Sequence, residues 1–87
     1  MQLKELLLMQ DLKIELDLTL TPERLWVANF SPMVEVAEDG VLIGTCGYGA
    51  SIDKAIFEMC MKVSNKRIRI SQPEGGEQRI NLSFVNP

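Results

Sequence analysis

The spacing of apolar residues changes along the chain, and each change predicts a different element. Leucines within residues 1–10 recur at helical spacing, which predicts a short helix at the start. From Leu12 to Leu20 the period becomes two, because each apolar residue is followed by a polar one. This alternation predicts an amphipathic strand with one face toward the core and one toward solvent.

Further strands are predicted on both sides of a longer helical pattern. Glu38-Asp39-Gly40 is predicted to form a hairpin turn, because Asp-Gly is a strong hairpin signal, and we expect the segments flanking it to pair. After the helix, apolar and charged residues alternate twice more. Four of these strands are expected at residues 24–30, 33–37, 41–46 and 66–71, and in the first of them Trp26, Ala28 and Phe30 share one face. In a last strand, Ile80, Leu82 and Phe84 are expected to face inward.

A glycine-rich segment leads directly into the helical pattern of residues 52–63. Ser51 is the predicted N-cap, and Asp53 places negative charge in the first turn, where the helix dipole favours it. One apolar face has a spacing near 3.6 residues and is expected to be buried against the sheet; it consists of Ile52, Ala55, Ile56, Met59, Cys60 and Val63.

Gly47, Gly49 and Ser51 are interpreted as a structural turn. Glycine permits positive φ and a close approach of strand and helix. A phosphate-binding loop is the weaker interpretation, because the segment has neither a third spaced glycine nor a Gly-Lys-Ser/Thr sequence. Asp53 would also repel an anion at the start of the helix.

The chain has 87 residues, which is enough for one domain over residues 1–87. With 46% hydrophobic and 24% charged residues, its composition is that of a folded globular protein. The predicted order is α-β-β-β-β-α-β-β. We therefore expect an α+β fold in which an antiparallel β-sheet carries helices packed on one face.

The residue types present exclude several chemistries. Histidine is absent from the sequence, which removes the commonest general base and the commonest transition-metal ligand. Cys46 and Cys60 are separated by thirteen residues, form no C-x-x-C pair, and are interpreted as buried free thiols. We therefore predict a protein that is not an enzyme, with no cofactor and no metal.

The lengths of the apolar runs indicate where in the cell the protein is located. Apolar runs in this chain fall well short of the roughly 18 residues that a membrane-spanning helix needs. Leu6 to Met9 is also too short for the apolar part of a signal peptide. We expect a cytoplasmic protein that does not contact the membrane.

Charge is distributed unevenly about a net value of −3. Nine of the twelve acids lie at or before Asp53, whereas six of the nine bases follow it. A compact basic group, formed by Lys62, Lys66, Arg67 and Arg69, would provide nucleic-acid contacts for duplex RNA. The alternative is a solvated helix end and strand face, and a pI of about 4.8 favours this alternative.

The longer helix has a second, smaller apolar surface. Phe57 and Met61 lie four residues apart and more than a quarter turn from the main apolar face. An exposed pair of this kind commonly marks an interface, here flanked by Lys54 and Glu58. The partner would be a second copy of the chain or a different protein. The alternative is that the first helix or the C-terminal hairpin covers both side chains.

The sequence positions of Trp26 and Tyr48 indicate whether each side chain lies in the core or at the surface. Trp26 alternates with Ala28 and Phe30, which favours core packing. Tyr48 stands between two glycines, where core packing and an exposed stacking surface are equally consistent with the sequence.

From the first helix through Gly47-x-Gly49-x-Ser51 the chain resembles double-stranded RNA-binding domains, which share the α-β-β-β-α plan and a G-x-G-x-S turn. That resemblance implies phosphate contacts from lysines at the start of the second helix. Here those positions are Ile52, Asp53 and Lys54, so most of the RNA-binding residues of the family are missing.

Two other resemblances concern shorter features. Residues 45–56 are similar to the strand, turn and helix of HicB-type antitoxins, which continue into a DNA-binding tail. The N-terminal Leu-Lys-Glu-Leu-Leu helix with a closing hairpin resembles small bacteriophage accessory proteins. This last resemblance implies a binding or adaptor protein that acts through protein–protein contact and modulates a host factor.

Overall fold

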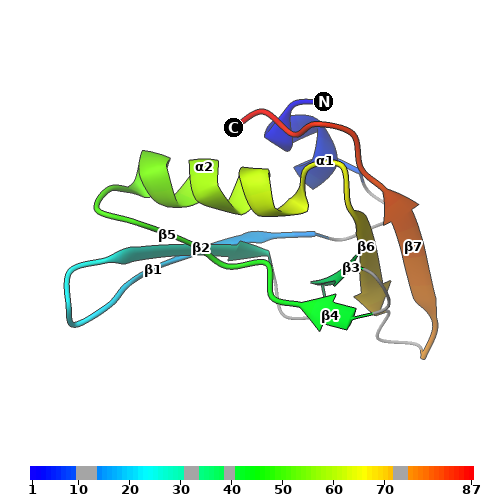
Figure 1. Ribbon diagram of the computed structural model, residues 1–87, viewed down its shortest axis with the longest axis horizontal. Helices are drawn as coiled ribbons and strands as arrows, with labels where there is room; N and C mark the ends of the chain where they lie inside the picture. The colour runs from blue at the N-terminus through cyan, green and yellow to red at the C-terminus, as the bar shows by residue number, and fades with distance from the viewer. Residues whose placement is uncertain (10–13, 31–33, 39–40, 72–74) are drawn as a thin grey trace.

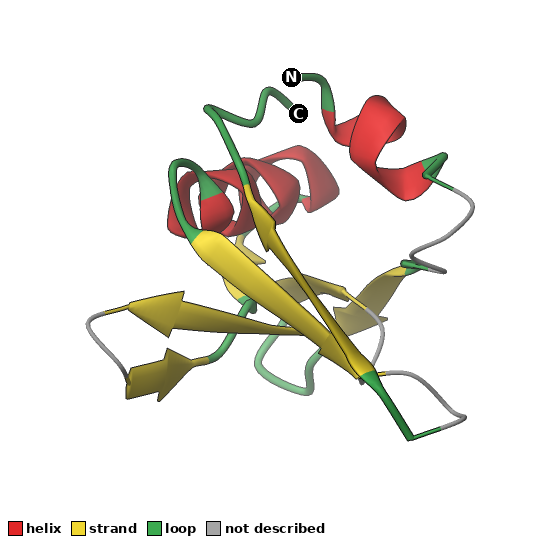
Figure 2. Ribbon diagram, turned by 90° about the vertical axis from the view of Figure 1, so that its right-hand side faces the viewer, coloured by secondary structure: helices red, strands yellow, loops and turns green. Residues whose placement is uncertain are grey.

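The computed structural model describes residues 1–9, 14–30, 34–38, 41–71 and 75–87 (Figure 1). Of the predicted turn at Glu38-Asp39-Gly40, Glu38 is the last residue of a strand instead, and Asp39 and Gly40 lie outside the described residues. The described part of the chain forms two antiparallel sheets and two helices, and the helices lie on the same side of the strands (Figure 2). The elements in chain order are α1 (Leu3–Leu7), β1 (Leu16–Leu20), β2 (Trp26–Phe30), β3 (Val34–Glu38), β4 (Val41–Ile43), β5 (Gly47–Gly49), α2 (Ile52–Val63), β6 (Arg67–Ser71) and β7 (Glu77–Asn81).

The predicted α+β class and antiparallel pairing are confirmed. The strands are nevertheless divided between two sheets, with orders β1-β2-β5 and β4-β3-β6-β7. The two C-terminal strands join the second sheet, because β6 pairs with β3 through the register Val34↔Ile70 to Ala37↔Arg67. The chain therefore passes from the first sheet to the second, returns for β5, and ends in the second.

The first two strands form a projecting hairpin (Figure 1). Their register runs from Leu16↔Phe30 to Leu20↔Trp26. The turn is closed by the Thr21 N–H, which donates to the Leu25 carbonyl at 2.8 Å, and by the Leu25 N–H, which donates to Thr21 Oγ1 at 3.1 Å. Threonine thus stabilises the turn through both its backbone and its side chain.

Gly47 and Gly49 lie in strand β5, which pairs with β2, rather than in a turn. Neither glycine has a positive φ, so the expected left-handed backbone is not found. The expected close approach to the helix is confirmed. A Cβ on Gly49 would lie 2.6 Å from the Ala55 nitrogen, and a Cβ on Gly47 would overlap the Ala55 carbonyl oxygen. The absence of side chains at these positions lets the α2 backbone lie directly on β5.

Helix α2 begins and ends where the sequence predicts. The Ser51 hydroxyl accepts a hydrogen bond from the Lys54 N–H at 3.2 Å, the expected N-cap contact. Asn65 follows the helix with a φ of 59°, a left-handed conformation that asparagine adopts more readily than most residues.

The apolar face of α2 is narrower than predicted. Ala55, Met59, Cys60 and Val63 are fully buried, Ile56 is half-buried, and Ile52 is 36% exposed. The prediction of a buried Ile52 is wrong because α2 meets β5 only from Lys54 and Ala55 onward, against Gly49. Ile52 therefore precedes the part of the helix that the sheet covers.

Segments from both ends of the chain close the core beyond the C-terminal end of α2. Leu3, Leu6, Leu82 and Val85 are buried there. The buried Ser64 hydroxyl donates to the Cys60 carbonyl at 2.6 Å and accepts from the Val85 N–H at 2.9 Å. These two bonds join the end of α2 to the C-terminal segment, which lies beside the N-terminal residues in both views (Figures 1 and 2).

Two predictions at the chain ends are wrong in extent. Helix α1 ends at Leu7, not at residue 10. Phe84 was predicted to face inward but is 46% exposed. Since β7 ends at Asn81, the strand alternation does not continue to Phe84, and the next residue, Val85, fills the core instead.

Strand β1 is less buried than its pattern suggests. Leu18 and Leu20 are 40% and 42% exposed, although each lies opposite a residue of the helix-covered face, Ala28 and Trp26 respectively. Helix α2 packs over β2 and β5, and β1 lies on the far side of β2. The helix therefore does not cover the outer half of this face.

Candidate functional site

The outer face of α2 presents the apolar pair found in the sequence. Phe57 is 54% exposed and Met61 is half-buried, so the described elements leave Phe57 uncovered. Lys54 is exposed and Glu58 is half-buried beside them. We call these four residues, Lys54, Phe57, Glu58 and Met61, the α2 outer surface.

Polar contacts fix one flank of this surface to the sheet. Glu58 Oε1 accepts a hydrogen bond from the Tyr48 N–H at 3.2 Å and lies 3.5 Å from Lys62 Nζ. Lys62 Nζ in turn donates to the Cys46 carbonyl and lies 5.4 Å from the centroid of the Tyr48 ring. Both charged residues of the pair are about 40% exposed, so the ion pair alone contributes only about 0.5 kcal/mol. Its main effect is to hold the helix side chains in one arrangement over β5.

Tyr48 belongs to this exposed region rather than to the core. Its side chain is 47% exposed, and the Lys62 ammonium group lies over its ring in a cation–π contact. The sequence left its position open because an aromatic residue between two glycines has no face assignment until the strand is recognised.

The basic group predicted from the sequence is only partly a cluster. Lys62 contacts the segment around β5, whereas Arg67 and Arg69 lie on β6 in the second sheet. Arg67 Nε donates to Asn81 Oδ1 at 3.0 Å. Lys66 lies between these two regions, where its N–H donates to Val63 and its carbonyl accepts from Leu82.

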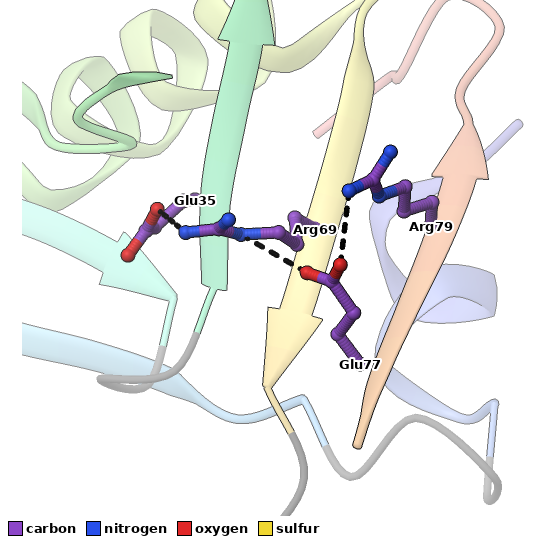
Figure 3. Close-up of polar contacts among 4 residues, drawn as sticks. All are labelled: Glu35, Arg69, Glu77 and Arg79. Atoms are coloured by element: carbon purple, nitrogen blue, oxygen red, sulfur yellow. Dashed lines mark hydrogen bonds and ion pairs between the residues drawn. The ribbon is translucent and has the colours of Figure 1, made fainter. Parts of the chain in front are cut away.

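Arg69 is held between two carboxylates (Figure 3). One terminal nitrogen lies 2.6 Å from Glu35 Oε2, and Nε lies 3.4 Å from Glu77 Oε2. Glu77 also accepts from Arg79 at 2.9 Å. Arg69 Nε is buried and makes no hydrogen bond within the described residues, and its contact with Glu77 is an ion pair only. The positive charge of Arg69 is therefore already balanced across three strands.

Sequence reasoning missed Glu35 as the partner of Arg69. The two residues are 34 positions apart and meet because β3 pairs directly with β6. Opposite charges at matching positions of two predicted strands are a signal for such a pair, but only after the strands are known to be neighbours.

The two cysteine thiols and the possible metal ligands were the candidate reactive groups of the described residues. Cys60 is a free, fully buried thiol, and burial raises its pKa above the ordinary value of 9.0. Cys46 is also free and is partly exposed. Within the described ranges, no group of three or more histidine, cysteine, aspartate or glutamate residues is placed to hold a metal ion. The same part of the chain contains no helix with the length and apolar character needed to cross a membrane.

Comparison of the chain with protein-family models, with curated proteins and with solved structures finds no match. The resemblances to double-stranded RNA-binding domains, HicB-type antitoxins and bacteriophage accessory proteins therefore stay predictions.

Proposed function

We propose that this chain is a non-enzymatic binding module whose α2 outer surface contacts a different protein. The observation that carries the proposal is the 54% exposure of Phe57 on a helix that is otherwise well packed against its sheet. Aromatic residues and methionine are enriched at protein interfaces, and a few well-packed side chains supply most of the binding energy there.

The surroundings of Phe57 support a preformed binding surface. The backbone of α2 rests directly on β5, Glu58 accepts a hydrogen bond from Tyr48 of that strand, and Lys62 donates to Cys46, the residue just before it. Little conformational freedom is therefore lost when a partner binds, which favours affinity. The fitting partner presents an apolar pocket for Phe57 and Met61, with a polar rim that accepts the charges of Lys54 and Glu58.

The test compares a double variant, Phe57→Glu with Met61→Glu, against Leu8→Glu as a matched control. Leu8 is 74% exposed and lies just after α1, so this control introduces one glutamate, half the charge change of the double variant, at another exposed apolar residue. A partner is first identified by photocrosslinking through a benzophenone side chain at position 57, and its affinity is then measured with purified proteins.

We expect the double variant to bind that partner at least about 30-fold more weakly, because two interface side chains each contribute more than about 1 kcal/mol. The control should bind like the unmodified chain. Equal binding by all three proteins would contradict the proposal. An unfolded double variant, seen by circular dichroism, would show that the two side chains belong to the core.

Duplex RNA is the weaker hypothesis for the same chain. Phosphate contacts need cations that are free to approach the backbone of the nucleic acid, and Arg69 already lies between Glu35 and Glu77. Affinity for duplex RNA that falls steeply with salt would support the RNA hypothesis instead. A role in modulating a host factor rests on the bacteriophage resemblance and stays a prediction.

A further inference from the structure

Strand β1 has one unpaired edge within the described structure. It is the terminal strand of the order β1-β2-β5 and pairs with β2 alone. The bond from the Thr21 N–H to the Leu25 carbonyl continues the ladder with β2 by one residue. Bonded and non-bonded pairs alternate in an antiparallel ladder, so Asp17 and Thr19 direct their backbone groups toward β2. The backbone groups of Leu16, Leu18 and Leu20 therefore point away from the sheet.

The described edges differ in how well they are protected against another strand. Strands β4 and β5 are three residues long, which leaves little backbone to pair. Strand β7 has five residues, but pairing it with a second β7 about its centre would place Arg79 opposite the partner's Arg79. Strand β1 also has five residues, and Asp17 is its sole charged residue.

We propose that a second copy of this chain pairs with β1 in antiparallel orientation, centred on Leu18. The sequence Leu-Asp-Leu-Thr-Leu is nearly the same in both directions, so a two-fold arrangement is self-complementary. Leu16 then lies opposite the partner's Leu20, and Leu18 opposite the partner's Leu18. All the outward backbone groups meet one another in this register, which gives about six hydrogen bonds over a strand pair of about 17 Å.

This pairing also covers the leucine side chains that α2 leaves exposed. Leu16, Leu18 and Leu20 lie opposite Phe30, Ala28 and Trp26, on the face of the sheet that carries α2. The 40% and 42% exposed side chains of Leu18 and Leu20 would adjoin the same row from the partner. The new contact continues the existing core face instead of starting a separate one.

The opposite face of the pair is complementary in hydrogen bonding. Asp17 lies opposite the partner's Thr19, and the symmetric contact repeats this pair. A threonine hydroxyl donates readily to a carboxylate, and no like charges face one another. Both residues are exposed in the single chain, so their substitution tests the contact without removing core packing.

The experiment measures self-association by sedimentation velocity over a concentration series for the unmodified chain, Thr19→Lys and Thr19→Glu. We expect a monomer–dimer equilibrium, and we expect Thr19→Lys to lower its dissociation constant about tenfold. Each of the two lysines then faces the Asp17 of the other copy. Thr19→Glu should weaken the dimer about tenfold by placing like charges opposite each other. Ser83→Lys and Ser83→Glu serve as matched controls, because Ser83 is an exposed residue outside β1.

Hydrogen exchange gives a second readout, which shows whether the outer edge of β1 is the edge that pairs. Amide protection at Leu16, Leu18 and Leu20 should rise with protein concentration, whereas the amides of Asp17 and Thr19 are already bonded within the chain. A chain that stays monomeric up to about 1 mM would overturn the proposal. A dimer with no response to either Thr19 charge would also overturn it. A dimer lost only in the Phe57→Glu, Met61→Glu variant would place self-association on the α2 outer surface and contradict both proposals.

Discussion

Substitution of Gly47 by alanine tests the close contact between the backbones of α2 and β5. A Cβ at this position would overlap the Ala55 carbonyl oxygen and the Met59 nitrogen and would lie 2.8 Å from Met59 Cα. All three are backbone atoms of α2. A side-chain rotation therefore cannot relieve the overlap, and the helix itself must move away from β5.

The expected cost follows from what that movement disturbs. Overpacking a core in which side chains can adjust costs about 1 to 3 kcal/mol, so displacement of a helix backbone should cost about 3 kcal/mol or more. A domain of 87 residues has a free energy of unfolding of about 4 to 13 kcal/mol. We expect Gly47→Ala to remove a large part of this stability and to lower the melting temperature by about 12 °C or more.

Gly44→Ala is the matched control, because a Cβ at Gly44 would meet nothing within 4 Å and its φ is not in the left-handed region. This substitution should change the free energy of unfolding by less than about 1 kcal/mol. Urea denaturation of both variants, followed by the fluorescence of Trp26 and by circular dichroism, measures the difference. If Gly47→Ala were as stable as Gly44→Ala, α2 would not rest on β5 as described.

Two further predictions concern α2. Ser51→Ala removes the hydroxyl that accepts from the Lys54 N–H and should lower the free energy of unfolding by about 1 kcal/mol, measured by urea denaturation, whereas Ser51→Asp should retain the cap. Burial raises the pKa of Cys60, so the folded chain retains the thiol proton above pH 9.0, where the unfolded chain loses it. Stability should therefore fall as pH rises above about 9, and urea titrations of Cys60→Ala over the same range should show a smaller fall.

Local patterns predicted the elements whose signals lie within a few residues. The N-cap at Ser51 and the apolar spacing after it gave the bounds of α2, and the alternation around Ile68 and Ile70 gave β6. Both signals depend on neighbouring residues alone. Such elements can be predicted without knowing what they pack against.

The features that were not predicted depend on partners distant in sequence. Strand β5 has only three residues, and its two glycines are typical of a turn; its pairing with β2 makes it a strand. The alternation in β1 correctly gives the face of Leu18 and Leu20, but it cannot give the width of the helix that covers that face. In the same way, the exposure of Phe57 depends on which elements surround α2.

The candidate site was predicted in part. Phe57 and Met61 were selected by their angle on the helix, and the structure places Phe57 at the surface. The basic group was selected because its residues are close in sequence. They are not all close in space, because the chain changes from helix α2 to strand β6 between Lys62 and Arg67. Arg69 gains its carboxylate partners from β3 and β7, and these contacts arise only when the second sheet assembles.

The path of the chain between the two sheets has a consequence for folding kinetics. Neither sheet consists of consecutive strands, because β3 and β4 intervene between β2 and β5, while β5 and α2 intervene between β4 and β6. Each sheet is therefore completed by a pairing that must close a long loop, and such loops slow folding. We expect the hairpins to form first and both sheets to be completed together, so that the domain unfolds in a single cooperative transition and neither sheet persists when the other is lost.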